Sequence, residues 1–503
     1  MDAGLRRASL HTVAGAYIGI DLGTSNSVVA VVEDGLPRVL PDKAGCVTTP
    51  SWVTFTEDAE VVVGAPARRQ AAANPHNTFS SVKRIIGRPF SAVQAELRAL
   101  PYAVVRSFDG SAELWCPALR RALAPAEVSA QILRHLVRRA EGYLGGGVEG
   151  AVIAVPAHFD AAQRAATAEA GRLAGLGSVQ LLQEPVAAAL AYGLGRAADE
   201  ALILVFDLGG GTFDCSLVEA FEGCLEVIAA GGDARLGGDD WDRALLTWLA
   251  GGRRGGAQVG SGPGAALAAA AAAAAADARG DPAAMARLTE AAETAKRALS
   301  GAEAAAVDLV VVEGGPGFRA EVTRAEFEAL TAPLRARLWP PLEAIGRQAF
   351  VEWAGRPIEV ALAESLDLVP ARAPTHGAPD SADAGGARGA AESGARAGAP
   401  AAERDAGGAA AQQRFRPAPM RITQVVMAGG ASRMPAVRRL VAALAGVAPR
   451  ETVNPEACVA LGAAIQAGVL TGQISGVELA DGAYSMDLHA RASGFQGFPT
   501  QPR

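Results

Sequence analysis

Two short segments that lie far apart in the chain each combine an aspartate with glycines and hydroxyl side chains. Residues 20–25 read Ile-Asp-Leu-Gly-Thr-Ser, and residues 206–212 read Phe-Asp-Leu-Gly-Gly-Gly-Thr. Glycines let a backbone approach a ligand closely, and successive N–H groups in such a turn form a concavity that binds anions. The hydroxyls of Thr24, Ser25 and Thr212 add further donors. These residue types at this spacing favour the binding of a polyphosphate.

The aspartates of the two segments, Asp21 and Asp207, would face each other across a cleft from the ends of two strands. A carboxylate cannot contact a phosphate directly, so this pair indicates a hydrated Mg²⁺ between the protein and the polyphosphate. Two lobes that close on a metal-bound nucleotide form a hinge, which can couple hydrolysis to a change of shape.

Composition argues against several other kinds of chemistry. The chain has 503 residues, and of its 46 lysines and arginines only Lys43, Lys83 and Lys296 are lysine. None of the three follows glycine or precedes serine or threonine, which excludes a P-loop. The net charge of −7 argues against nucleic acid as the main partner. The histidines form no i, i+4 pair and no G-x-S-x-G occurs, so neither a histidine metal site nor a catalytic triad is expected.

The remaining bulk features point to a globular protein with reduced thiols. The five cysteines form no C-x-x-C pair, which is typical of core thiols in a reducing compartment. We find no apolar run of membrane-spanning length, and residues 1–16 lack the apolar block of a secretory signal. No membrane partner is expected.

The elements that must position the two aspartates alternate between strands and helices. Each aspartate-bearing turn joins two apolar runs, 17–20 with 27–32 and 202–206 with 214–219, and so predicts a β-hairpin. A second turn signal follows each hairpin, at 34–35 and 222–223, and we infer an internal duplication that gives two similar lobes. Further strands are predicted at 151–155 and 425–428, and helices at 160–174, 185–192, 287–299, 435–445 and 455–470.

Two segments interrupt this pattern. Residues 251–283 are rich in Gly and Ala, and residues 370–419 consist almost entirely of small, charged and proline residues. Such stretches cannot bury enough apolar surface to offset the entropy lost on ordering. We therefore predict two disordered insertions in an otherwise folded chain.

With these motifs the chain resembles the DnaK-type seventy-kilodalton heat-shock chaperones of the actin and sugar-kinase superfamily, over nearly all of residues 17–472 outside the insertions. Ile-Gly-Ile-Asp-Leu-Gly-Thr-Ser-Asn-Ser at 18–27 and Phe-Asp-Leu-Gly-Gly-Gly-Thr-Phe-Asp at 206–214 look like the two phosphate motifs. Segments at 48–51, 77–84, 155–159, 183–185 and 236–242 follow in the family's order. Residues 293–300 and 429–435 resemble the two halves of the adenosine pocket, and 454–456 opens the final helix.

The resemblance implies a two-lobed, actin-like ATPase fold of the α/β class, with duplicated ribonuclease-H-like lobes. Residues 17–199 would form lobe I, residues 200–447 lobe II, and residues 448–472 a helix that returns to lobe I. Residues 1–16 would be an N-terminal extension and 473–503 a tail.

It also implies slow hydrolysis of ATP to ADP with Mg²⁺ and K⁺, in a chaperone that assists protein folding. Lys83 is similar to the lysine that orients the attacking water, and Asp21, Asp207 and Asp214 look like the carboxylates that organise the metal ions and water. Glu184 and Thr212 complete the catalytic set, with Asp21 and Asp207 as the residues nearest the metal. The implied nucleotide-binding residues are Gly23, Thr24, Ser25, Asn26, Gly209, Gly210, Gly211, Thr212, Gly238, Glu293, Lys296, Arg297, Ser300, Gly429, Gly430, Arg433 and Glu456. Arg297 and Arg433 would sandwich the base.

The sequence departs from the family's pattern most strongly near its C-terminus. Val-Glu-Leu-Ala-Asp at 477–481 looks like a degraded form of the leucine-rich linker, with Glu478 and Ala480 where leucines are expected. Placing a carboxylate in an apolar groove costs about several kcal/mol. We therefore expect weak or absent linker stimulation and no peptide-binding domain. Ala431 replaces a hydroxyl near the nucleotide, which would weaken binding by about 1 kcal/mol.

Partners and alternatives follow from the same resemblance. J-domain co-chaperones and nucleotide-exchange factors are the implied partners, although the insertion at 370–419 would lie where exchange factors bind, and unfolded clients are not expected without a peptide-binding domain. A non-catalytic, nucleotide-dependent interaction module and a sugar or metabolite kinase remain alternative functions. The expected location is the cytoplasm, with a plastid as the alternative, because residues 77–88 resemble bacterial and plastid forms.

Overall fold

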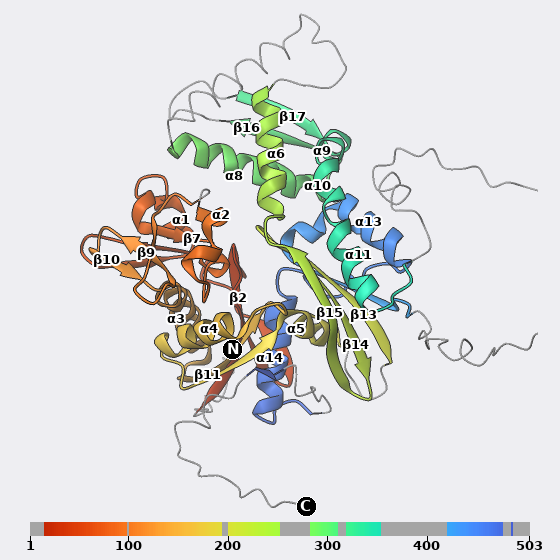
Figure 1. The fold of residues 1–503 in the computed structure, drawn as a ribbon, viewed down its shortest axis with the longest axis horizontal. Helices are drawn as coiled ribbons and strands as arrows, with labels where there is room; N and C mark the ends of the chain where they lie inside the picture. Colours follow the sequence, from red (N-terminus) through yellow and green to blue (C-terminus); the bar gives the residue numbers. More distant parts are fainter. Residues whose placement is uncertain are drawn as a thin grey trace, which may run out of the picture.

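The computed structural model describes residues 15–97, 100–193, 200–251, 282–309, 318–353, 420–475 and 484–485. The predicted insertion at 370–419 and the linker-like segment at 477–481 lie outside these residues. So does most of the first insertion, whose ends belong to helices α6 (Gly238–Gly251) and α8 (Pro282–Leu299). The described residues form two α/β lobes with similar sheets, as the duplicated hairpins predict (Figure 1).

The sheet of the first lobe is built around the first predicted hairpin. Strand β1 (Ala16–Asp21) pairs antiparallel with β2 (Asn26–Glu33) and parallel with β11 (Val148–Val155). The full order is β19-β12-β11-β1-β2-β3, with β4 also paired to β2. The outer strands are β3 (Leu36–Val39), β4 (Thr49–Pro50), β12 (Ser178–Gln183) and β19 (Tyr484–Ser485).

The sheet of the second lobe repeats this arrangement. Strand β13 (Ala201–Leu208) pairs antiparallel with β14 (Phe213–Phe221) and parallel with β18 (Gln424–Ala428), and β15 (Cys224–Asp233) extends β14. The two aspartates occupy equivalent positions, since Asp21 lies opposite Ala154 of its parallel neighbour and Asp207 lies opposite Ala428. The predicted duplication is confirmed.

The turns that follow the two hairpins also match. Asp34 and Gly35 have φ angles of 52° and 75°, and Glu222 and Gly223 have φ angles of 49° and 84°. Consecutive positive φ angles define the turn that suits the right-handed twist of the flanking strands. Both turns therefore reverse the chain in the same way, as their shared sequence signals predict.

Two helices with small residues separate the sheets. Helix α5 (Glu184–Ala191) and helix α14 (Cys458–Leu470) bury alanines and glycines against apolar residues from both lobes. A Cβ added to Gly462 would lie 1.7 Å from the carbonyl oxygen of Ala187, so the backbones of the two helices are in direct contact. This close crossing joins the lobes at the base of the cleft, where a hinge would have to bend.

The outer helices complete each lobe. In the first lobe, α3 (Pro125–Leu144) and α4 (Ala161–Leu173) pack beside the sheet, and Asp160 caps α4 by accepting from the Gln163 amide at 2.9 Å. In the second lobe, α11 (Trp339–Gln348) packs on β14 and β15, and α13 (Pro435–Ala445) follows β18.

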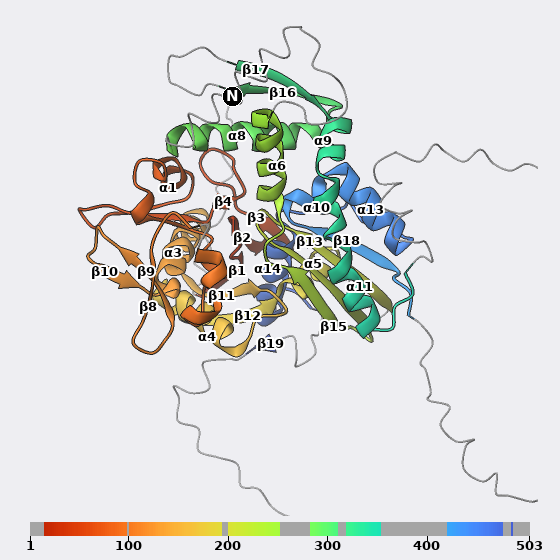
Figure 2. The ribbon, with the colours of Figure 1, turned by 45° about the horizontal axis from the view of Figure 1, so that its top comes forward.

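Smaller elements complete each lobe, and in Figure 2 α8 lies just below β16 and β17 and extends towards α1. The first lobe carries β5 (Trp52–Phe55), β6 (Val61–Val63), α1 (Ala65–Gln70), η1 (Pro75–Asn77), β7 (Thr78–Ser80), η2 (Val82–Arg84), η3 (Phe90–Ala92), α2 (Gln94–Leu97), β8 (Val104–Arg106), β9 (Ala112–Cys116) and β10 (Arg121–Leu123). The second carries β16 (Ala304–Leu309), β17 (Phe318–Thr323), α9 (Arg324–Leu330), α10 (Ala332–Ala336) and η4 (Gly430–Arg433).

The structure moves several predicted boundaries: α8 begins at Pro282 rather than at residue 287, and β11 begins at Val148 rather than at residue 151. The last helix begins at Cys458 rather than at Pro455, because Asn454 organises a turn before it. The Asn454 side-chain oxygen accepts from the Glu456 amide at 3.0 Å, and its carbonyl accepts from the Ala457 amide at 2.9 Å. This turn places Glu456 beside the cleft. No helix in the described part of the chain is long and apolar enough to cross a membrane.

Candidate functional site

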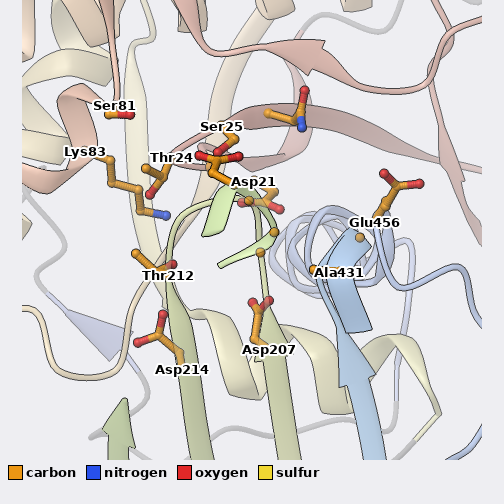
Figure 3. Close-up of a pocket in the computed structure, with 18 of the residues that line it drawn as sticks. Asp21, Thr24, Ser25, Ser81, Lys83, Asp207, Thr212, Asp214, Ala431 and Glu456 are labelled. Atoms are coloured by element: carbon orange, nitrogen blue, oxygen red, sulfur yellow. The ribbon is translucent and has the colours of Figure 1, made fainter. Parts of the chain in front are cut away.

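A cavity of about 930 Å³ separates the two lobes, and both aspartate-bearing turns line it (Figure 3). Every residue predicted for the metal, for catalysis or for the nucleotide contributes to its lining, with one exception. The exception is Gly211, whose carbonyl oxygen accepts a hydrogen bond from Nη2 of Arg84 at 2.5 Å. Tertiary packing thus brings the separate sequence motifs to one site.

The two aspartate-bearing turns, at residues 20–25 and 206–212, approach each other closely. A Cβ added to Gly210 would lie 2.4 Å from Oγ of Ser25 on the opposite turn, so this position requires glycine. Backbone hydrogen bonds brace the second turn, from Gly238 N to Gly209 O at 2.9 Å and from Asp239 N to Gly210 O at 2.7 Å. The segment 236–242 therefore supports the turn from behind.

Lys83 places an ammonium group between the two turns. It belongs to the short 3-10 helix η2, which follows Ser81 in the left-handed region at a φ of 56°. In Figure 3 its side chain points into the cavity between Thr24 and Thr212. Nζ donates to Oε1 of Glu184, and both side chains are almost fully buried. Burial lowers the pKa of Lys83, but attraction to Glu184 and Asp21 outweighs it, so its pKa lies above the ordinary value.

Several carboxylates surround the single ammonium group of Lys83, namely those of Asp21, Glu184, Asp207 and Asp214. Burial raises the pKa of Asp21 to about 7, although Lys83 opposes the rise. Burial also raises the pKa of Asp207 well above its usual value, and the neighbouring Glu184, Asp214 and Asp21 add to the effect. Carboxylates in such surroundings are stabilised in their charged form by an added cation.

The arrangement fits a hydrated divalent cation better than a directly coordinated one. No group of three or more His, Cys, Asp or Glu side chains among the described residues has the geometry to hold a metal ion by itself. Mg²⁺ binds oxygen ligands and usually keeps several of its waters. Asp21 and Asp207, which lie at the ends of β1 and β13, can accept hydrogen bonds from such waters.

His158 is a cavity residue that the motif analysis did not assign. Its Nδ1 lies 3.2 Å from Oδ1 of Asp214. This hydrogen bond raises the pKa of His158 above its ordinary value, against the opposing effect of burial. His158 belongs to the segment 155–159, which resembles the family's connection between lobes. That motif could therefore have identified His158 as a site residue.

At the far end of the cavity, Lys296 makes a buried ion pair rather than an exposed contact. Its Nζ lies 2.7 Å from Oδ2 of Asp242 and 3.0 Å from the Gly238 carbonyl oxygen. Burial raises the pKa of Asp242 to about 6, and Lys296 partly offsets this rise. Lys296 therefore ties α8 to α6 behind the second turn. Asp242 was part of a recognised segment but was not predicted as a site residue.

Glu456 lies between two arginines that were predicted to flank the base. Arg297 Nη2 is 3.4 Å from Glu456 Oε1, and Arg433 Nε is 3.8 Å from Glu456 Oε2. Arg433 also donates to Oδ1 of Asn454 at 2.5 Å. The structure thus brings the two guanidinium groups to one end of the cavity, although the second insertion separates Arg297 from Arg433 in the sequence.

Two further contacts cross between the lobes. Arg68 Nη2 of α1 is 2.7 Å from Glu293 Oε2 of α8. Arg84 of η2 reaches the turn of the second lobe through Gly211. Arg84 lies within a recognised motif, whereas Arg68 lies in none, so only the fold could identify it.

Comparison with known families and proteins shows which proteins this chain resembles. Residues 17–355 and 415–493 match the family model described as Hsp70 protein. The chaperone protein dnaK3 of Thermosynechococcus vestitus is 40% identical over 471 residues, which cover 93% of this chain and 57% of that protein. The chaperone protein dnaK of Cyanidioschyzon merolae is 39% identical over 470 residues, 92% of this chain and 63% of that protein.

A third relative, the chaperone protein DnaK 1 of a Synechococcus species, is 40% identical over 471 residues, which cover 93% of this chain and 52% of that protein. The chain therefore spans about half to three-fifths of the length of these curated relatives. The matched part includes both hairpins, the segments on either side of each insertion and the final helix.

Proposed function

This chain belongs to the Hsp70 family, and from that premise we propose that its two lobes bind ATP with Mg²⁺ and hydrolyse it slowly to ADP. The observation that supports this most directly is the buried Lys83–Glu184 pair inside the cavity formed by the two phosphate-type turns. Family membership implies that the chain binds a nucleotide and Mg²⁺. We further propose that these residues hydrolyse the bound nucleotide.

The phosphates would lie between the two turns. Backbone N–H groups of residues 23–25, 210 and 212 and the hydroxyls of Thr24, Ser25 and Thr212 would supply donors there. Gly210 supports this placement, because any side chain at its position would collide with Ser25 and close the approach. The glycine turns thus leave room for a ligand that side chains would exclude.

Asp21 and Asp207 would hold the waters of Mg²⁺, and the bound ion would supply neutralising charge at the phosphates. Their raised pKa values support this assignment, because a buried carboxylate that binds protons strongly gains the most from a nearby cation. We assign a potassium ion to the same acidic end of the site, beside Asp214. Replacing K⁺ with Na⁺ in the hydrolysis assay tests that assignment.

Lys83 would orient the attacking water and stabilise charge on the γ-phosphoryl group, with Glu184 holding the ammonium in place. Phosphoryl transfer depends mainly on positioning and electrostatic stabilisation, and a buried ammonium acts strongly because little water screens it. Thr212 and Asp214 line the same end of the cavity. They would complete the polar surroundings of the water.

The adenosine would occupy the opposite end. Glu293 and Ser300 of α8, with Gly429 and Gly430 before α13, line the cavity there. Arg297 and Arg433 would stack on the base, exchanging their contacts with Glu456 for the aromatic ring. Lys296 would act indirectly in this arrangement, since its charge is already paired with Asp242.

At the level of the whole protein we propose a chaperone-type role that assists folding, with J-domain proteins and nucleotide-exchange factors as partners. This part of the proposal rests on family membership and on relatives that carry chaperone names.

Single-turnover hydrolysis of labelled ATP tests the catalytic proposal, with Lys83→Ala and the matched control Lys43→Ala. Lys43 is an exposed loop lysine, so its loss should leave the rate unchanged. Removing Lys83 should lower the rate by about 100-fold or more. Equal rates in wild type and Lys83→Ala would contradict the assigned role. Tight ATP binding without turnover would identify a non-catalytic module, and turnover only with an added sugar would identify a kinase.

A further inference from the structure

The residues assigned to hydrolysis are divided between the two lobes. Lys83 of η2 and Glu184 of α5 belong to the first lobe. Asp214 of β14 belongs to the second lobe, as does Thr212 in the turn before that strand. Phosphoryl transfer depends on positioning, and a displacement of about 1 Å can slow such a reaction roughly 100-fold. Hydrolysis therefore requires a contact that fixes the separation of the lobes at this level of the cleft.

The segment that carries Lys83 is held firmly within the first lobe. Val82 and Ile85, which precede and follow Lys83 and Arg84, are buried in the core of that lobe. Nη1 of Arg88 donates to the Arg84 carbonyl oxygen at 3.0 Å. These contacts fix the backbone of η2. The position of Lys83 relative to the second lobe therefore depends on what joins η2 to that lobe.

The side chain of Arg84 makes such a connection. Its Nη2 donates to the Gly211 carbonyl oxygen at 2.5 Å. The two residues pack tightly, because a Cβ added to Gly211 would collide with Nη2, and the three atoms nearest to that Cβ all belong to Arg84. Nε of Arg84 is buried and has no hydrogen-bond acceptor among the described residues. Since Nε is shielded from the open cleft, it is not placed to reach a ligand there.

The turn that Arg84 contacts is fixed within the second lobe. The Gly209 amide donates to the Thr212 carbonyl oxygen at 3.0 Å, and the Asp239 amide donates to the Gly210 carbonyl oxygen at 2.7 Å. Thr212 follows Gly211 directly in this turn. Contact with Arg84 at Gly211 therefore sets the position of Thr212 relative to η2.

We propose that Arg84 is a positioning residue, whose hydrogen bond to Gly211 fixes the separation between Lys83 and Thr212. Hydrolysis would then proceed only when the second lobe has closed onto η2. In this role Arg84 acts through its neighbour Lys83 and through the turn, and it makes no contact with the nucleotide. The inference rests on the proposed hydrolysis of ATP.

Measuring ATP affinity and the single-turnover rate separately in Arg84→Met tests this role. Methionine removes the donor but retains an apolar side chain of similar reach. The rate should fall by about 10- to 100-fold, because Lys83 and Thr212 are no longer held at one separation. The dissociation constant of ATP should change by less than about threefold, since a positioning residue adds no contact to the ground state. An unchanged rate, or a loss of affinity as large as the loss of rate, would overturn the proposal.

Gly211→Ala tests the same contact from the other lobe and keeps the charge of Arg84. The φ angle of Gly211 lies outside the left-handed region, so its backbone accepts alanine, and the added methyl group displaces Nη2. The rate should fall as in Arg84→Met, and the double variant should be no slower than the slower single variant. Losses that add in the double variant would show that the two residues act separately. This variant also decides the question if Arg84→Met does not fold.

Arg134→Met is the matched control. Nη2 of Arg134, on α3, donates to the Leu173 carbonyl oxygen at 2.5 Å, but both residues belong to the first lobe. Its loss should leave the single-turnover rate at the wild-type value, and an equal loss in this variant would overturn the assignment to Arg84. A wild type that does not hydrolyse ATP would contradict the proposed function itself. Turnover in the wild type with no loss in Arg84→Met and Gly211→Ala would contradict only the role of Arg84.

Discussion

Arg68 and Glu293 form a 2.7 Å ion pair that joins helix α1 of the first lobe to helix α8 of the second, beside the large cavity between the lobes. Both side chains line that cavity. Burial raises the pKa of Glu293, but the hydrogen bond from Arg68 and the attraction of nearby cations outweigh it, so its pKa lies below the ordinary value. The carboxylate therefore stays ionised at neutral pH, and the lobes are linked by charge.

Loss of this link should accelerate release of nucleotide. In Arg68→Ala, opening of the lobes no longer breaks an ion pair, and we expect ADP to dissociate about two- to five-fold faster, the range for a partly exposed pair. Stopped-flow release of a fluorescent ADP measures the rate. The exposed neighbour Arg69 provides the control, since Arg69→Ala should release ADP as the wild type does. Identical rates in all three proteins would show that the pair does not hold the lobes together.

Asp207 should make the affinity for ATP depend on Mg²⁺. In Asp207→Asn the metal's waters lose a charged acceptor, so ATP affinity in Mg²⁺ should fall by about tenfold or more, roughly 1.4 kcal/mol. In EDTA the affinity should stay equal or improve, because a negative charge near the phosphates has been removed. Calorimetric titration under both conditions measures this, with the exposed Asp58→Asn as control. A parallel loss in EDTA would mean that Asp207 supports the fold rather than the metal.

Asp242 should contribute to the pH dependence of stability. Its folded pKa of about 6 lies above the ordinary value of an aspartate, chiefly because of burial. A raised carboxyl pKa stabilises the folded state at low pH, and this contribution disappears as pH rises through 6. The free energy of unfolding should therefore decline more between pH 5 and pH 7 in the wild type than in Asp242→Asn, by about 1–3 kcal/mol. Urea unfolding at both pH values measures this, and equal declines in both proteins would contradict it.

Gly462 should be intolerant of even one added carbon. A Cβ there would lie 1.7 Å from the Ala187 carbonyl oxygen, so Gly462→Ala must separate α14 from α5 and should destabilise the protein by about 1–3 kcal/mol. Gly142 of α3 is the matched control, because a Cβ at that position meets no atom within 4 Å. Gly142→Ala should stabilise the protein by about 0.5 kcal/mol. Denaturant unfolding of both variants measures the contrast, and similar effects would show that the crossing can relax.

Much of the fold was predictable because its signals are local. The two hairpins are encoded by apolar runs around glycine turns, and their strands appear as expected, with Asp207 paired to Asp214 across the second hairpin. The helix predicted at 160–174 follows from its Asp160 cap, which needs only four neighbouring residues. The start of α14 was placed three residues too early, because the Asn454 turn competes with helix formation through side-chain hydrogen bonds that propensity does not reveal.

The sequence predicted which residues belong to the candidate site, but not which residues they contact. Motifs located Lys83, Glu184 and Lys296, since each stands in a recognisable segment. They could not show that Lys296 is paired with Asp242, or that Arg84 reaches Gly211 in the other lobe. Those partners depend on how separate segments pack.

By itself, the sequence determined the two glycine turns, the duplicated lobes and the small set of residues able to bind a metal nucleotide, because each is a short-range pattern of residue types. Only the tertiary structure decided which charges are buried and what they face. The Arg68–Glu293 link and the buried Lys296–Asp242 pair arise from helices brought together by the burial of apolar side chains. Long-range packing sets the electrostatics of such groups, because desolvation depends on every neighbour and not on adjacent residues alone.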